Sequence, residues 1–281
     1  MTALSSELRD QTAASTPSSN HPRERRRRSL STWRRVLTMA AFETRMLARQ
    51  RTTLLTLLMG PALVFGIAVV QQTADPAAWS RLMGLGSLVV IVFSTHWGAL
   101  FVAVARREQQ VFKRLRTSEL SSAQLVAAVF GPFVILGVLE VVLVSVLFAA
   151  RGGVHPQAVL PWALGVLLAS AGLVAAGVAV AGVSASTEKA NWTGVPLIFL
   201  VAGAANLLLM PLPDERISMA LLMVPFVSLV DLVSRSTNAS TGLAELPLPL
   251  PAEVTDLLLL GLWSGAALWF AVSRWRWEPR S

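Results

Sequence analysis

Few residues of this 281-residue chain could carry out chemistry, because it has no cysteine and only three histidines. The lack of cysteine excludes disulfides, thiol nucleophiles and cysteine-based metal sites. His21, His96 and His155 lie in a polar tail, an apolar run and a turn, which argues against a catalytic triad. Neither lysine follows a glycine, so there is no P-loop, and there is no HExxH zinc motif. We therefore expect no catalytic site, no metal and no cofactor bound by this chain.

Two ionisable residues, His96 and Glu140, lie inside long apolar runs. Such groups are costly in a membrane and usually face a bundle interior or water. Glu140 could bind a cationic substrate or carry a proton; alternatively, it is a protonated or paired carboxyl that fixes helix packing. His96 is interpreted as a packing residue. Together with Asn206 and Phe226, these residues are candidates for a substrate path or for packing between helices.

A third group of polar residues forms the basic segment RREQQVFKRLRTSELSS, residues 106–122. This segment contains five cations and two acids and lies between two apolar runs, which predicts a cytoplasmic loop. Val111, Phe112 and Leu115 follow one another at helical spacing, as in a short amphipathic helix that docks on a soluble partner. The candidate contact residues of this segment are Arg107, Glu108, Phe112, Arg114, Leu115 and Arg116.

The composition indicates an integral membrane protein, since 54% of the residues are hydrophobic and 14% are charged. Soluble domains carry about 25% charged residues. In a soluble protein the net charge of +8 would suggest nucleic-acid binding. Here the charges lie at the edges of apolar runs, so we expect contact with membrane lipid and no nucleic-acid partner.

The N-terminal part is predicted to lie on the cytoplasmic side of the membrane. Residues 1–30 read as a disordered basic tail, rich in Ser, Pro and Arg. Residues 31–51 read as an amphipathic helix in the membrane interface. Its apolar face is predicted to hold Val36, Leu37 and Leu47, with Phe42 and Glu43 interrupting the pattern. The candidate interfacial residues are Trp33, Arg34, Arg45 and Arg49.

The remaining chain is predicted to be all-α, with six membrane-spanning helices in residues 52–273. Apolar runs of about 20 residues are long enough to cross a bilayer. Residues 212–236, with Pro211, Pro213 and Pro225, read as a re-entrant helical hairpin on the outer side. Residues 274–281 form a second cytoplasmic tail. The six spans lie at about 52–70, 82–105, 123–150, 158–184, 192–210 and 254–273.

Residues 31–273 resemble ABC-2 type transporter permeases of the daunorubicin-resistance or antibiotic-efflux kind. Four features carry the resemblance: FETRMLARQRTTLLTLLMGP, RREQQVFKRLRTSELSSAQL, the small-residue fourth span, and LLLMPLPDERISMALLMVPFVSLVDLVSR. In the last, Pro211, Pro213, Pro225, Phe226, Asp231 and Arg235 occupy the family's positions. The resemblance implies an interfacial helix, a cytoplasmic coupling helix between spans two and three, and an outer re-entrant pair. It also implies a homodimer or paralogous heterodimer with separate ATPase subunits, which hold ATP and Mg.

The expected function is therefore export of an amphipathic or hydrophobic compound, such as a drug, an antibiotic or a lipid-like molecule. The expected location is a bacterial plasma membrane, with both termini in the cytoplasm. Two alternatives remain open. One is an ion- or proton-coupled secondary transporter that uses Glu140, and the other is a non-transporting immunity or anchor protein.

Overall fold

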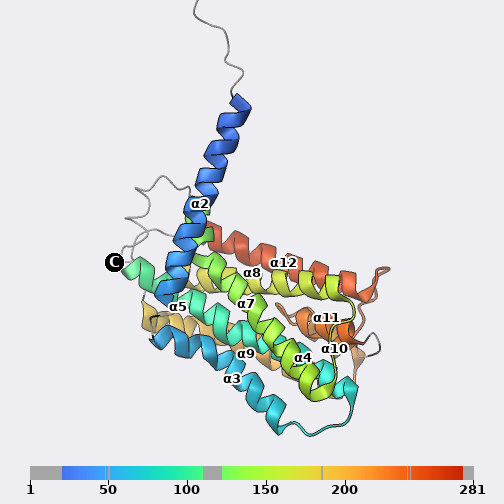
Figure 1. Cartoon of the computed structure of the whole chain (residues 1–281). Helices are drawn as coiled ribbons and strands as arrows, with labels where there is room; N and C mark the ends of the chain where they lie inside the picture. Colours follow the sequence, from blue (N-terminus) through green and yellow to red (C-terminus); the bar gives the residue numbers. More distant parts are fainter. Residues whose placement is uncertain are drawn as a thin grey trace, which may run out of the picture.

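The computed structural model describes residues 21–47, 49, 51–109, 122–184, 186–238, 240 and 242–274. This part of the chain is helical and contains no strand, which confirms the predicted all-α class (Figure 1). Five of its helices are long and apolar enough to cross a membrane, which supports a multi-pass membrane protein. They are Pro76–Glu108, Val126–Gly152, Val159–Val183, Thr187–Leu208 and Ala252–Ser273.

The first two described helices are α2, His21–Leu47, and α3, Arg51–Val70. α2 begins well before the predicted start at residue 31, so part of the predicted disordered tail is helical. Pro22 stands in its first turn, where a missing N–H costs little, and the following Arg and Glu residues favour helix. The apolar part of α3, Leu54–Val70, is shorter than the five long helices.

The first of the five long helices, Pro76–Glu108, is a rod made of α4, Pro76–Val90, a π-helical turn η1, Ile91–His96, and α5, Trp97–Glu108. Asp75 caps it by accepting from the N–H of Ala77 at 2.9 Å. The hydroxyl of Thr95 donates to the Ile91 carbonyl at 2.7 Å, and that of Ser94 donates to Val90. Such bonds compete with the backbone ladder, and π turns of this kind are frequent at functional sites.

Helix α8, Val159–Val183, lies at the centre of the bundle, against the α4–η1–α5 rod, α7, Ser122–Gly152, and α12, Ala252–Arg274. Two glycines of α8 allow this close packing. A Cβ at Gly177 would lie 2.6 Å from the His96 carbonyl oxygen, and one at Gly172 would lie 2.3 Å from the Ser264 hydroxyl. These small residues let neighbouring helix backbones approach one another.

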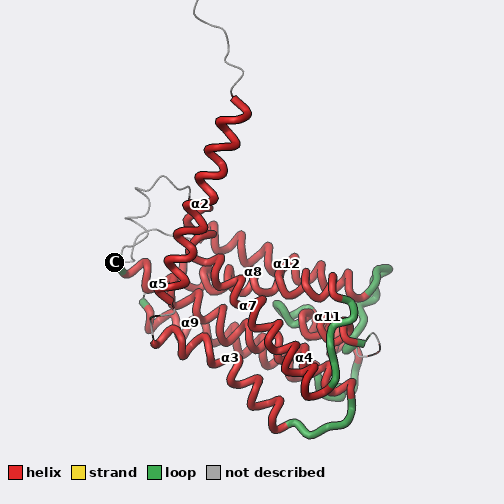
Figure 2. Tube along the Cα trace, in the orientation of Figure 1, coloured by secondary structure: helices red, strands yellow, loops and turns green. Residues whose placement is uncertain are grey.

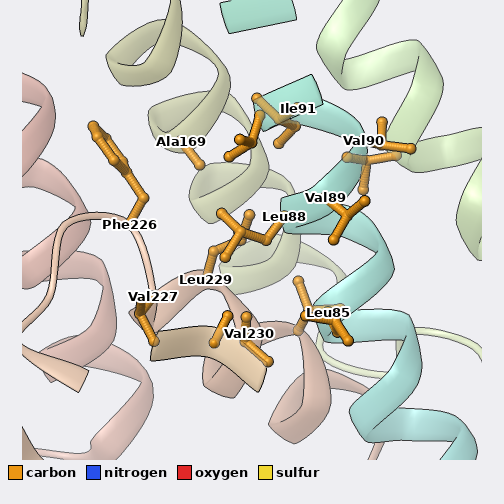
Figure 3. Close-up of a cluster of buried hydrophobic side chains, with 14 of the residues drawn as sticks. Leu85, Leu88, Val89, Val90, Ile91, Ala169, Phe226, Val227, Leu229 and Val230 are labelled. Carbon is orange, nitrogen blue, oxygen red and sulfur yellow. The ribbon is translucent and has the colours of Figure 1, made fainter. Parts of the chain in front are cut away.

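Two short helices, α10, Glu215–Leu222, and α11, Ser228–Thr237, follow α9, Thr187–Leu208. With 8 and 10 residues, neither could cross a bilayer. All ten residues of α11 are buried. Leu229 and Val230 lie beside Leu88 and Leu85 of α4, and Val227 belongs to the same buried cluster (Figure 3). Most of the described loops lie at the end of the bundle that holds this pair, whereas the short link between α8 and α9 lies beside the last turn of α5 (Figure 2).

The outer surface of the long helices is apolar. Large exposed hydrophobic side chains occur on α3, α7, α9 and α12, including Leu55, Leu139, Phe199 and Trp269. Exposed apolar residues scattered singly are ordinary in soluble proteins, but whole faces of long helices are not. The exposed faces match the hydrocarbon of a bilayer or the surface of another membrane helix.

Candidate functional site

The predicted contact segment is described only where it begins. Arg107 and Glu108 lie in the last turn of α5. Phe112, Arg114, Leu115 and Arg116 lie outside the described residues. We therefore build the site from the last three residues of α5, Arg106, Arg107 and Glu108, which we call the α5 end cluster.

Arg106 forms an ion pair with Glu43 of α2. Both side chains are largely buried, and burial raises the pKa of the Glu43 carboxyl, while the nearby Arg106 charge acts in the opposite direction. The sequence pattern placed Glu43 as an interruption of an apolar face. In the structure it lies on the buried face of α2, where it joins that helix to α5.

The buried face of α2 contains Val36, Glu43 and Leu47, whereas Leu37 is 62% exposed and Phe42 is 61% exposed. An exposed apolar side chain is what contact with lipid in the membrane interface requires, so the predicted interfacial position of α2 stays a prediction. Glu43 is held on the buried face by Arg106.

Arg107 binds the C-terminal end of α8. Its guanidinium donates to the carbonyl of Ala181 at 2.6 Å and to that of Ser184, and the residue is buried. The last carbonyls of a helix lack partners within the helix and carry partial negative charge. Arg107 therefore caps α8 with a cation. Its predicted contact with an ATPase stays a prediction.

Glu108 binds the N-terminal end of α9. Its carboxylate accepts from the backbone N–H of Thr187 at 2.9 Å and from the Thr187 hydroxyl at 3.0 Å. Anionic groups stabilise helix N-termini, where N–H groups are unpaired. Ser186 completes the cap by accepting from the N–H of Lys189 at 3.3 Å. Three consecutive residues of α5 thus hold α2, α8 and α9.

The predicted interfacial residues lie on or beside α2. Arg34, Arg45 and Arg49 are exposed. Trp33 is part of the helix, but its side chain lies outside the described residues. Exposure of the three arginines is compatible with contact to lipid headgroups, which stays a prediction.

A second site lies halfway along the bundle, where η1, α7 and α8 meet. The Ser94 hydroxyl contacts the Glu140 carboxyl, and His96 Nδ1 lies 2.8 Å from the Leu173 carbonyl oxygen. Among the residues that the structure describes, neither His96 Nε2 nor the Ser170 hydroxyl has a hydrogen-bond partner. We call Ser94, Thr95, His96, Glu140 and Ser170 the central polar cluster. Its members are all buried.

The structure does not bring Asn206 into this cluster. Asn206 is exposed on α9, and its amide donates to the Ala202 carbonyl at 2.8 Å. Phe226 is buried in the turn between α10 and α11, has a positive φ of 63°, and packs close to Gly172. Pro225 precedes it, while Pro211 and Pro213 are exposed between α9 and α10.

Sequence reasoning missed a polar network at the end of the bundle that holds α11. Arg235 donates to Asp231 at 2.6 Å, to the Ala244 carbonyl at 2.8 Å and to Glu245 at 3.3 Å. The other Asp231 oxygen accepts from the N–H of Leu243. These bonds fix the loop that follows α11. The i, i+4 spacing of Asp231 and Arg235 on a helix was the available signal.

The comparisons with known proteins do not identify this chain: no protein-family model and no curated protein matches it. Within the described residues, no group of three or more His, Asp or Glu side chains could hold a metal ion. The two sites therefore rest on their geometry alone.

Proposed function

We propose that this chain is the permease subunit of an ATP-driven exporter of the ABC-2 type, powered by separate ATPase subunits. The observation that carries the proposal is the α5 end cluster. Arg106, Arg107 and Glu108 begin the segment predicted to contact the ATPase and bind three other helices. A displacement of residues 110–121 would therefore reach α2, α8 and α9 together.

The proposed topology has six spans, with α3 as the first. Its 20 residues correspond to about 30 Å at 1.5 Å per residue, close to the thickness of the bilayer core. The pair α10–α11 is then a re-entrant hairpin on the outer side. The basic residues of the α5 end favour a cytoplasmic location for that end, and hence for both termini, in a bacterial plasma membrane.

In the proposed mechanism, ATP and Mg bind to the partner ATPase, and this chain supplies the path. Closure of the ATPase subunits would move residues 107–118 together with the helix at 31–50, and the α5 end cluster would pass that movement to the ends of α8 and α9. The chain's long helices carry few charges, which favours an amphipathic or hydrophobic cargo.

A second permease copy is part of the proposal. The outward face of α9 carries exposed residues at alternating spacings of four and three: Trp192, Pro196, Phe199, Gly203 and Asn206. This is the spacing of a helix–helix seam. An amide facing hydrocarbon is costly, and contact with a second chain would shield Asn206. Its intrahelical bond uses one of the two amide hydrogens.

The experiment is purification from native membrane followed by reconstitution in vesicles. We expect a P-loop ATPase to co-purify and to drive transport. Replacing Phe112 and Leu115 by glutamate should leave ATP hydrolysis but abolish coupled transport. The matched control replaces Leu248 and Leu250, which are exposed at the opposite end, by glutamate. Activity of the purified chain alone in pH-driven vesicles would instead favour a secondary transporter, and resistance without ATP hydrolysis would favour an immunity protein.

A further inference from the structure

In the central polar cluster, the Ser94 hydroxyl has more oxygen contacts than it has hydrogens to donate. It contacts two oxygens, the backbone carbonyl of Val90 at 2.5 Å and the carboxyl of Glu140. A serine hydroxyl has one hydrogen and can accept through two lone pairs. A carbonyl oxygen and an ionised carboxylate can both only accept, so the single Ser94 hydrogen cannot satisfy both contacts. Both are satisfied when the carboxyl holds a proton, because Ser94 then donates to Val90 and accepts from Glu140.

The charges around Glu140 lead to the same conclusion. Ser94 is its hydrogen-bond partner in the described structure, and no ion pair to a described cation is present. The residue is 7% exposed near the midpoint of α7. An ionised carboxylate there would be an uncompensated charge in a low-dielectric interior, which is strongly unfavourable.

The ionisable groups on the helices around Glu140 do not compensate this charge. His96 is the one located in the middle of the bundle, and its Nδ1 is directed to the Leu173 carbonyl. α8 has no ionisable residue. The other ionisable groups on the same helices lie at their ends, roughly 16–21 Å from Ser94 or Glu140 at 1.5 Å per residue. They are Arg81, Arg106, Arg107, Glu108 and Arg151. On neighbouring helices, Arg51 is at the start of α3, and Glu43 and Arg45 are on α2 against α7.

We propose that Glu140, Ser94 and the Val90 carbonyl form a proton-binding site in the middle of the bundle. The proton joins α7 to the π turn η1 through one hydrogen bond. When the proton leaves, the Ser94 hydroxyl donates to the carboxylate instead, and its bond to the Val90 carbonyl at the start of η1 is lost. The site does not depend on the proposed cargo or on the ATPase partner.

Infrared difference spectroscopy of the full chain in lipid nanodiscs tests this site directly. The spectrum of the wild type minus that of Glu140→Gln should contain a protonated-carboxyl band at neutral pH, and the band should be lost as the pH rises. The matched control is Glu215→Gln, because Glu215 is exposed at the start of α10. The difference spectrum for that substitution should not contain the band assigned to Glu140.

A second variant tests the hydrogen-bond partner even if Glu140→Gln folds poorly. Ser94→Ala removes the acceptor, so the Glu140 band should move in frequency. Hydrogen–deuterium exchange of residues 91–96 should increase in the wild type over the same pH range in which the band is lost, and stay constant in Glu140→Gln. This ties proton loss to the η1 contact.

Three results would overturn the proposal. An absent band at neutral pH would mean that the carboxyl is ionised. A band that persists at every pH at which the protein stays folded would mean a permanently neutral packing group. A band lost only in sodium and retained in potassium would mean that the site takes a metal cation in place of the proton.

Discussion

Replacing Arg107 by methionine is the sharpest test of the α5 end cluster, because the side chain is buried and its acceptors are known. Its guanidinium donates to the carbonyls of Ala181 and Ser184. Methionine retains much of the packing volume but no donor. An unsatisfied buried acceptor costs about 1–3 kcal/mol, so two such carbonyls cost roughly 2–6 kcal/mol. Removing a buried cation also removes its desolvation cost, which offsets part of this loss. We expect a net destabilisation of about 2–4 kcal/mol.

The assay is reversible unfolding of the purified chain in mixed micelles, followed by the fluorescence of its tryptophans. Arg45→Met is the matched control, since Arg45 is exposed on α2 and a surface substitution changes stability by about 0.5 kcal/mol or less. If Arg107→Met has the same free energy of unfolding as this control, Arg107 does not cap α8 and the structural reasoning fails. In the reconstituted complex, the same variant should hydrolyse ATP but transport less cargo, because α8 is detached from the end of α5.

Three further predictions concern other contacts. An alanine at Gly177 would place its Cβ 2.6 Å from the His96 carbonyl oxygen, so Gly177→Ala should lower the free energy of unfolding by about 1–3 kcal/mol. Gly261→Ala is the control, because a Cβ there meets nothing within 4 Å, and it should leave the free energy of unfolding unchanged. Equal effects of the two substitutions would contradict the close approach of α8 and η1. Asn206→Leu should weaken self-association in micelles, measured by sedimentation; unchanged association would remove α9 from the proposed dimer contact. Burial raises the pKa of Glu43 above 4.5, so the folded chain binds that proton more tightly than the unfolded chain. The stability contributed by Glu43 should therefore fall as pH rises through the raised pKa. Glu43→Gln should abolish this pH dependence, measured as the shift of the unfolding midpoint with pH. If the variant keeps the same pH dependence, Glu43 is not its source.

The positions of the helices were predictable because each apolar run has one simple cause, the thickness of the bilayer. The third run was predicted at 123–150 and the helix is Ser122–Gly152; the fourth was predicted at 158–184 and the helix is Val159–Val183. Pro211, Pro213 and Pro225 marked the short helices that follow the fifth run. Length and composition are properties of a segment alone, so no knowledge of neighbours was needed.

The contacts of individual polar residues were not predictable in this way, because each depends on a partner far along the chain. Glu43 looked like a flaw in an amphipathic pattern until Arg106 was found beside it. Ser94 gave no signal of the π turn, since its bond to Val90 is common in membrane helices and its partner Glu140 is 46 residues away. The sequence therefore predicted which polar residues belong to the candidate site, but not which contacts they make.

The two polar sites act on the same helical rod at different depths. η1 meets α7 and α8 through the central polar cluster, and α5 ends in the cluster that holds α2, α8 and α9. Gly177 sets the spacing between α8 and this rod, because its missing side chain lets α8 approach the backbone at His96. A change in the length or tilt of η1 would displace the end of α5 along the same axis, since a π turn holds more residues per turn than an α-helix. Ser94, the contact of the proposed proton-binding carboxyl, and the residues proposed to couple to ATP belong to one continuous rod, so altering the Ser94–Glu140 contact should alter the position of the α5 end.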